Sequence, residues 1–306
     1  MLQYVVKRLL GALPTLLVII TLAFFLIRLA PGGPFDTERP MPPEIAANME
    51  RAYHLDKPLP MQYGYYLLNV LQGDLGPSFK YKDHSVSSLI AEGFPVSLQL
   101  GVFAMLLALL VGIPAGMLAA LHHNRPLDHA VMAVSMTGIT VPNFVMAPLL
   151  ALVFGVLLHW LPVAGWDQGW KSAVLPVIAL ALPQIAYVAR LMRAGVLETL
   201  SSPHIRTAVA KGLPMRLIVW RHVLKGALLP VLSWLGPATA AIITGSVVIE
   251  QIFGIPGIGR HFVQGALNRD YTLVMGVVIF YGALIILMNL LVDVIYGWMD
   301  SRVRYD

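Results

Sequence analysis

The chain has 306 residues, of which 58% are hydrophobic and only 12% are charged, and its mean hydropathy is +0.74. Soluble domains carry about 25% charged residues, and a soluble fold of this size would not bury so much apolar surface. The absence of cysteine excludes disulfides and thiolate chemistry. The net charge of +5 does not indicate nucleic-acid binding, because the cations gather in segments that flank apolar runs.

Six runs contain no Asp, Glu, Lys, Arg or His, and as helices each is long enough to cross a hydrocarbon core of about 30 Å. They lack the alternation that a membrane β-barrel requires. The sequence therefore predicts an all-α membrane protein with six transmembrane helices. The six runs lie at 9–27, 96–121, 130–158, 172–189, 226–249 and 271–292.

Two of these runs have unusual features. The first follows Lys7 and Arg8, but it is longer than the apolar part of a signal peptide and no A-x-A site follows it, so we expect an uncleaved anchor. The third is longer than one span needs. We expect either a kink at Gly138 or Pro142, or a start within the membrane interface.

Most Lys and Arg residues fall in the segments on one side of the predicted spans, while the segments on the other side carry a small negative charge. The positive-inside rule then predicts that both termini are cytoplasmic. We expect a single membrane domain, 1–306, with an outside segment at 31–95 and a cytoplasmic loop at 190–225. In the outside segment Tyr63, Tyr65 and Tyr66 are candidates for docking a partner, or for packing against the helix ends.

Recognisable catalytic and metal-binding motifs are missing from the sequence. No Lys directly follows a Gly, so there is no Walker A motif, and H-E-x-x-H and G-x-S-x-G are absent too. His122, His123 and His129 lack metal-site spacing, and we assign no metal. The stretch 254–259 predicts a tight turn into a short amphipathic helix. Asp293, at the end of the last run, is the only candidate for an ionisable residue within a span. A self-sufficient carrier usually relies on such residues near the middle of the membrane, so their scarcity disfavours one. An intramembrane hydrolase is disfavoured because the sequence shows no nucleophile or metal constellation for it.

The loop at 190–225 is the most informative segment. Ser201 and Ser202 offer a helix N-cap, Pro203 fits the first helical position and Gly212 fits the position after the end, which predicts a short helix at 204–211. Ile205, Ala208 and Val209 are expected to share one apolar face. Such a helix either inserts into a partner's groove or lies on anionic lipid, and composition does not decide between them.

The letters R-T-A-x-A-K-G-L at 206–213 resemble the EAA loop of ABC-importer permeases, in the form typical of the peptide-importer branch. Further similarity lies at Q-Y (62–63), G-D-L-G-P-S (73–78), I-P-G-I-G (255–259) and A-L-N-R-D-Y (266–271). Arg206 and Thr207 stand where the general motif has Glu and Ala. The likeness covers nearly the whole chain, and the chain resembles the B-type permease subunit of a bacterial oligopeptide ABC importer.

This resemblance implies a type I ABC importer permease fold and a multi-pass protein of the bacterial inner membrane. It also implies a second, C-type permease subunit, two cytoplasmic ATPase subunits, a periplasmic or lipid-anchored binding protein and a peptide substrate. ATP and Mg²⁺ would be used by the partner ATPases, while this chain would bind no cofactor and would not be an enzyme. Importers of dipeptides, murein peptides, glutathione or nickel are the nearest alternatives.

In that scheme two sets of residues matter. The residues expected to couple the chain to the ATPases are Ile205, Arg206, Thr207, Ala208, Val209, Lys211, Gly212 and Leu213. Those expected to dock the binding protein are Tyr63, Tyr65, Tyr66, Arg260 and Arg269.

Overall fold

A computed structural model describes residues 2–29, 55–81 and 83–299 of the chain. Only part of the predicted outside segment 31–95 therefore falls within the described residues. Within them every regular element is a helix, and a single isolated bridge pairs Pro77 with Ser85. The all-α prediction is confirmed for this part of the chain.

Helices make up most of the described residues. In order they are α1 (Leu2–Leu29), α3 (Leu59–Leu71), α4 (Val86–Leu121), α5 (Pro126–Thr140), α6 (Asn143–Leu150), the π-helical η1 (Ala151–Leu157), α7 (Trp170–Leu200), α8 (Pro203–Ala210), α9 (Met215–Ile218), the π-helical η2 (Val219–Val223), α10 (Leu224–Ala227), α11 (Leu229–Gly245), α12 (Val247–Phe253), α13 (Ile258–Leu267) and α14 (Tyr271–Met299).

Five helical stretches are long and apolar enough to cross a membrane: Leu10–Leu29, Val86–Leu121, Trp170–Leu200, Leu229–Phe253 and Tyr271–Ile295. They correspond to five of the six predicted runs. The fourth run was expected to end at residue 189, but α7 stays helical to Leu200, so the non-helical part of the predicted loop begins only at Ser201.

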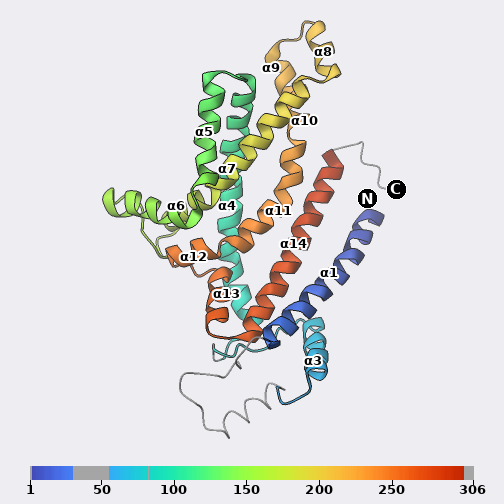
Figure 1. Cartoon of the computed structure of the whole chain (residues 1–306), viewed down its shortest axis with the longest axis vertical. Helices are drawn as coiled ribbons and strands as arrows, with labels where there is room; N and C mark the ends of the chain where they lie inside the picture. Colours follow the sequence, from blue (N-terminus) through green and yellow to red (C-terminus); the bar gives the residue numbers. More distant parts are fainter. Residues whose placement is uncertain (1, 30–54, 82, 300–306) are drawn as a thin grey trace.

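The third predicted run does not form one straight span. Its two halves, Pro126–Thr140 and Asn143–Leu157, meet at an angle of 101°, and α6 projects sideways from the bundle (Figure 1). Pro142 explains the break, because it disfavours helical geometry at the preceding residue, and Val141 is extended there. Counting the bent pair as one crossing gives six spans, and the number six stays a prediction.

The centre of the bundle is the crossing of α4 and α7 (Figure 1). Small residues allow the two backbones to approach closely: a methyl group on Gly116 would overlap the carbonyl oxygen of Ala189, and one on Gly112 would lie 2.8 Å from the Val188 side chain. Close backbone approach of this kind is how apolar helices associate where lipid removes the hydrophobic driving force. α14 packs against α11 on one side and α1 on the other.

The two ends of the bundle differ. One end, here named the α8 end, carries α8 and α9, and the start of α1 and the end of α14 point toward it; the opposite, α13 end carries α3 and α13 (Figure 1). At the α8 end the Asp128 carboxylate is 1% exposed and receives Nε and Nη2 of Arg193, each at 2.7 Å. The backbone N–H of Asn124 donates to the same carboxylate at 3.0 Å. This bidentate ion pair links the α4–α5 turn to α7.

We predict that Arg193→Met destabilises the fold by roughly 3–5 kcal/mol, because it leaves the buried Asp128 carboxylate without a cation. The matched control is Arg190→Met, one turn earlier on α7, where an exposed guanidinium lies 5.2 Å from the Tyr187 ring centre. Thermal unfolding of the purified chain in detergent should show a lower midpoint for Arg193→Met and little change for Arg190→Met. Equal midpoints for the two variants would contradict this role of the ion pair.

Candidate functional site

Helix α8 forms where the sequence predicted a short helix, between two turns with defined chemistry. It begins at Pro203, which suits the first helical position because it has no N–H to leave unpaired. The expected side-chain cap is absent. The Ser202 hydroxyl donates instead to the carbonyl oxygen of Thr199 at 2.6 Å, so it ties the turn to the end of α7.

Helix α8 ends in a turn closed by two backbone hydrogen bonds, which requires a residue with left-handed backbone angles. The N–H of Gly212 donates to the carbonyl of Val209 at 2.9 Å, and the N–H of Leu213 donates to that of Ala208 at 3.3 Å. These two bonds form a Schellman motif with Gly212 at φ +76°. A Cβ on Gly212 would meet nothing within 4 Å, so its backbone angle alone makes glycine suitable here.

The apolar face of α8 differs from the expectation. Ile205 and Ala208 are 2% and 6% exposed and belong to an apolar cluster with Met192 of α7 and Val223 of η2. Val209 is 52% exposed and lies outside this cluster. Of the three residues expected to share one apolar face, only Ile205 and Ala208 are therefore buried against the rest of the protein.

The other predicted coupling residues lie around the free side of α8. Leu213 is half-buried and packs against the same apolar cluster. The side chains or backbone exposed to the surroundings are those of Arg206, Thr207, Val209, Lys211 and Gly212. The loop from residue 199 to 225 contains no Asp or Glu, so this free side is cationic.

At the α13 end, two of the three tyrosines are internal contacts. The Tyr63 hydroxyl lies 2.6 Å from the Thr21 hydroxyl, and its ring packs against Phe24 with 5.3 Å between ring centres. Tyr66 also stacks on Phe24, and burial raises the pKa of its hydroxyl, an effect that Arg28 opposes. These residues hold α3 against α1.

The remaining predicted docking residues are accessible. Tyr65 is 43% exposed, and its side chain lies on a different face of α3 from Tyr63 and Tyr66. Arg260 is exposed in the first turn of α13, and Arg269 is exposed just after its end, at φ +57°.

The Asp270 carboxylate joins two motifs that are far apart in the sequence. It is fully buried and accepts hydrogen bonds from the Ser78 hydroxyl, from the backbone N–H groups of Phe79 (3.1 Å) and Lys80 (3.3 Å), and from Leu273 N–H at 3.2 Å. The last of these bonds caps the start of α14. The G-D-L-G-P-S and A-L-N-R-D-Y segments therefore meet at one buried carboxylate.

A second buried carboxylate, Glu250, was missed by the sequence interpretation. The fifth run was taken to end at residue 249, which placed Glu250 outside, yet the residue is 0% exposed within the candidate span Leu229–Phe253. It accepts hydrogen bonds from the hydroxyls of Ser97 (2.7 Å) and Ser246 (2.5 Å) and from the backbone N–H of Arg260 (3.2 Å). No Lys or Arg side chain pairs with it among the described residues.

The glycine-rich stretch packs around this carboxylate. A methyl group on Gly257 would overlap the Glu250 carboxyl group, and one on Gly259 would lie 2.9 Å from its Oε2. The N–H of Ile258 donates to the Ser97 hydroxyl at 2.9 Å. The predicted tight turn into a short helix is confirmed as Gly254, at φ +64°, followed by α13. The glycines bring α13, α12 and α4 together at Glu250.

The described residues contain no group of three His, Cys, Asp or Glu side chains placed to hold a metal ion. The His122–His129 region instead contributes to the ion pair at the α8 end, where His123 Nδ1 lies 3.0 Å from Nη2 of Arg193.

Comparison with known proteins gives consistent matches. The sequence profile described as "binding-protein-dependent transport system inner membrane component" matches residues 112–305, and the N-terminal profile of the same systems matches residues 1–101. The oligopeptide transport system permease protein OppB of Escherichia coli K12 is 54% identical over 306 residues, which is 100% of both chains. The dipeptide transport system permease protein DppB of Bacillus subtilis is 43% identical, covering 99% of this chain and 98% of its own length.

Similarity to solved structures shows the fold. An inward-facing MetNI methionine ABC transporter chain matches with a TM-score of 0.58 at 18% identity, covering 70% of this chain and 97% of its own. A second crystal form of that transporter gives a TM-score of 0.59. The arrangement of helices is therefore that of a type I ABC importer permease.

We predict that Gly257→Ala lowers the stability of the purified chain by roughly 1–3 kcal/mol, because the methyl group would overlap the Glu250 carboxyl group. Pro256→Ala is the control, since Pro256 is exposed and precedes the crowded position by one residue. Thermal unfolding in detergent measures both. An unchanged midpoint for Gly257→Ala would show that Glu250 is not tightly enclosed.

Proposed function

The chain belongs to the family of binding-protein-dependent inner membrane transport components, and we propose that this membrane subunit of a peptide ABC importer transmits the work of partner ATPases through α8. The buried attachment of Ile205 and Ala208 to α7 and η2 carries the proposal. A force applied to the free side of α8 would move these neighbours with it, because a packed apolar cluster has little room to deform.

The proposed partners follow from membership of the family. They are a second, C-type permease that completes the translocation pathway, two cytoplasmic ATPase subunits and a periplasmic or lipid-anchored binding protein that delivers the substrate. The missing Walker A lysine supports the need for separate ATPases that bind ATP and Mg²⁺. Alternation between two states of the importer would then be biased from both sides of the membrane.

We propose oligopeptides as the substrate class. The identity to oligopeptide permeases, 54%, exceeds that to the dipeptide permease of B. subtilis, 43%, over nearly the same length. Dipeptide import is the alternative. A self-sufficient carrier is a weaker candidate, because the matching relatives are permease proteins of transport systems whose family is named for its dependence on binding proteins.

We propose further that the α8 end is cytoplasmic. The basic loop at 199–225, together with the start of α1 and the end of α14, which point toward this end, supports that orientation under the positive-inside rule. The α13 end would then face the binding protein, with Tyr65, Arg260 and Arg269 as the exposed residues available for docking. Asp270 and Glu250 would keep this surface fixed to α14, α12 and α4.

The free side of α8 has two possible contacts, an ATPase surface or anionic lipid, because its cations suit either. Gly212 distinguishes them. We predict that Gly212→Val abolishes peptide uptake while membrane levels stay near normal. A left-handed β-branched residue costs roughly 1–2 kcal/mol, which is small for the fold and large for a helix that must fit a partner's groove.

The matched control is Gly212→Asn, because asparagine tolerates left-handed geometry and should retain most transport. Uptake of a labelled oligopeptide, co-purification of the ATPases and their activity are measured for both variants. Normal values of all three for Gly212→Val would mean that α8 rests on lipid and does not couple. Loss of membrane insertion in both variants would contradict the claim that only the turn is affected.

A further inference from the structure

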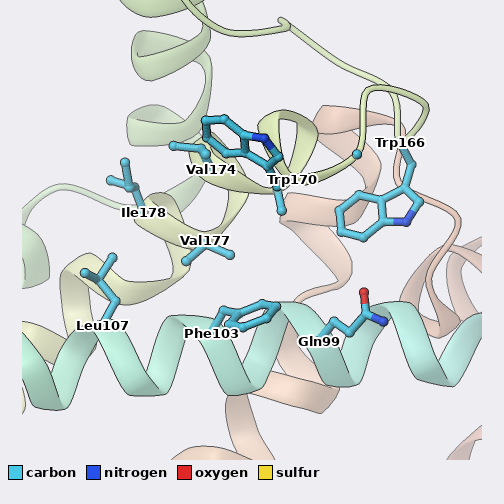
Figure 2. A pocket seen from close by; sticks show the side chains of 10 residues that line it. Gln99, Phe103, Leu107, Trp166, Trp170, Val174, Val177 and Ile178 are labelled. Atoms are coloured by element: carbon cyan, nitrogen blue, oxygen red, sulfur yellow. The ribbon is translucent and has the colours of Figure 1, made fainter.

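A cavity of about 710 Å³ lies between α4 and the first half of α7, near the α13 end. Figure 2 shows Phe103 and Gln99 on the α4 side, Val177 on the α7 side and two indole rings, Trp166 and Trp170, near the connection into α7. None of these residues belongs to the coupling or docking sets.

The lining of the cavity suits hydrocarbon. Apart from the two indole N–H groups, Gln99 supplies the only polar side chain, and the other lining side chains are aliphatic or aromatic. A peptide carries charged ends and an amide at every residue. Burying such groups without partners costs roughly 2–7 kcal/mol for each neutral one and more for a charge, so the cavity is a poor resting place for the transported peptide.

The surroundings indicate where the occupant comes from. The cavity opens on an apolar surface of two candidate spans, where Phe103 and Trp170 are 54% and 72% exposed, and this surface continues along α4 through Leu106 and Leu110. Tryptophans concentrate at the level of lipid headgroups. Trp170 lies at the start of α7, and Trp160 lies in the connection before it. Hydrocarbon at this depth is supplied by lipid tails.

One cation neighbours the lining in the sequence. Lys171 is exposed in the first turn of α7 and directly follows Trp170, which lines the cavity. An ammonium group there complements a phosphate, and the tail of the same molecule would reach the apolar lining. The combination of an apolar cavity, two lining indole rings and an exposed cation next to one of them in the sequence fits an amphipathic anion.

We propose that this cavity binds an acyl chain of an anionic phospholipid whose phosphate lies at Lys171. The acyl chain would lie between α4 and the start of α7, two central spans of the bundle. The site requires only that these helices lie in a bilayer, and it holds whether or not α8 couples to ATPases.

The test uses the assembled importer in vesicles of phosphatidylethanolamine and phosphatidylglycerol, with a fraction of phosphatidylglycerol carrying a diazirine midway along one tail. After illumination, mass spectrometry locates the labelled peptides. We expect labelling of the Phe103 and Val177 segments, loss of that labelling in Val177→Trp, which fills the cavity, and reduced labelling in Lys171→Gln. Leu110→Trp, on the exposed face of α4 outside the cavity, should leave it unchanged.

If Val177→Trp lowers membrane levels, Ala173→Phe on the same wall replaces it, with the same expected loss. Three results would overturn the proposal: equal labelling over all exposed apolar surface, labelling of the cavity by a photoreactive peptide in place of the lipid, or cross-linking of Phe103→Cys to the second permease subunit. The first would mean only loosely surrounding lipid, the second a peptide site and the third a subunit interface.

Discussion

The packing of Ile205 and Ala208 against α7 and η2 is the contact on which the proposed mechanism depends. A helix of two turns has little stability of its own in water, so α8 persists because its buried stripe joins a larger apolar cluster. The same burial leaves the cationic side of α8 free and fixes its direction relative to α7 and η2. Met192 and Val196 of α7 lie in this cluster, and α7 crosses α4 at the centre of the bundle. Movement of α8 therefore has a direct mechanical route into the helices that define the bundle.

The α13 end is organised by a different principle, the need to satisfy buried carboxylates. Glu250 and Asp270 are each fully enclosed, and each gathers hydroxyl and backbone N–H donors from segments far apart in the chain. Because a buried unpaired carboxylate is strongly destabilising, these donors are held in a single arrangement. The short segments between spans, whose Leu75, Ile255 and Ile258 also pack into apolar clusters, are thereby held in place. Proteins that receive a partner on such a surface gain from this order, since less entropy is lost on docking.

The sequence predicted well the features that depend on local composition. Apolar runs located five long helices, because bilayer thickness sets their length, and Pro203 and Gly212 located α8 through backbone constraints. It failed where tertiary contact decides. Periodicity placed Val209 with Ile205 and Ala208, but which stripe is buried depends on where η2 packs. Glu250 was placed outside because a carboxylate usually ends a span; the glycines at 257 and 259 were the only sign of its enclosure. For Tyr63 and Tyr66 the sequence left docking and packing against the helix ends both open, and their contact with Phe24 of α1 leaves no trace in the sequence of α3.

The most direct test of the central claim is proximity between the free side of α8 and an ATPase. The chain contains no cysteine, so single cysteines report unambiguously. In membranes containing the assembled importer, a maleimide that carries a photoreactive benzophenone and is attached to Val209→Cys should cross-link to an ATPase subunit on illumination, and ATP should change the yield. Ala208→Cys, one residue away and 6% exposed, should give no link. If Val209→Cys reacts with a soluble maleimide in the transporting complex yet never links to an ATPase, α8 does not contact the ATPases and the account of coupling is wrong.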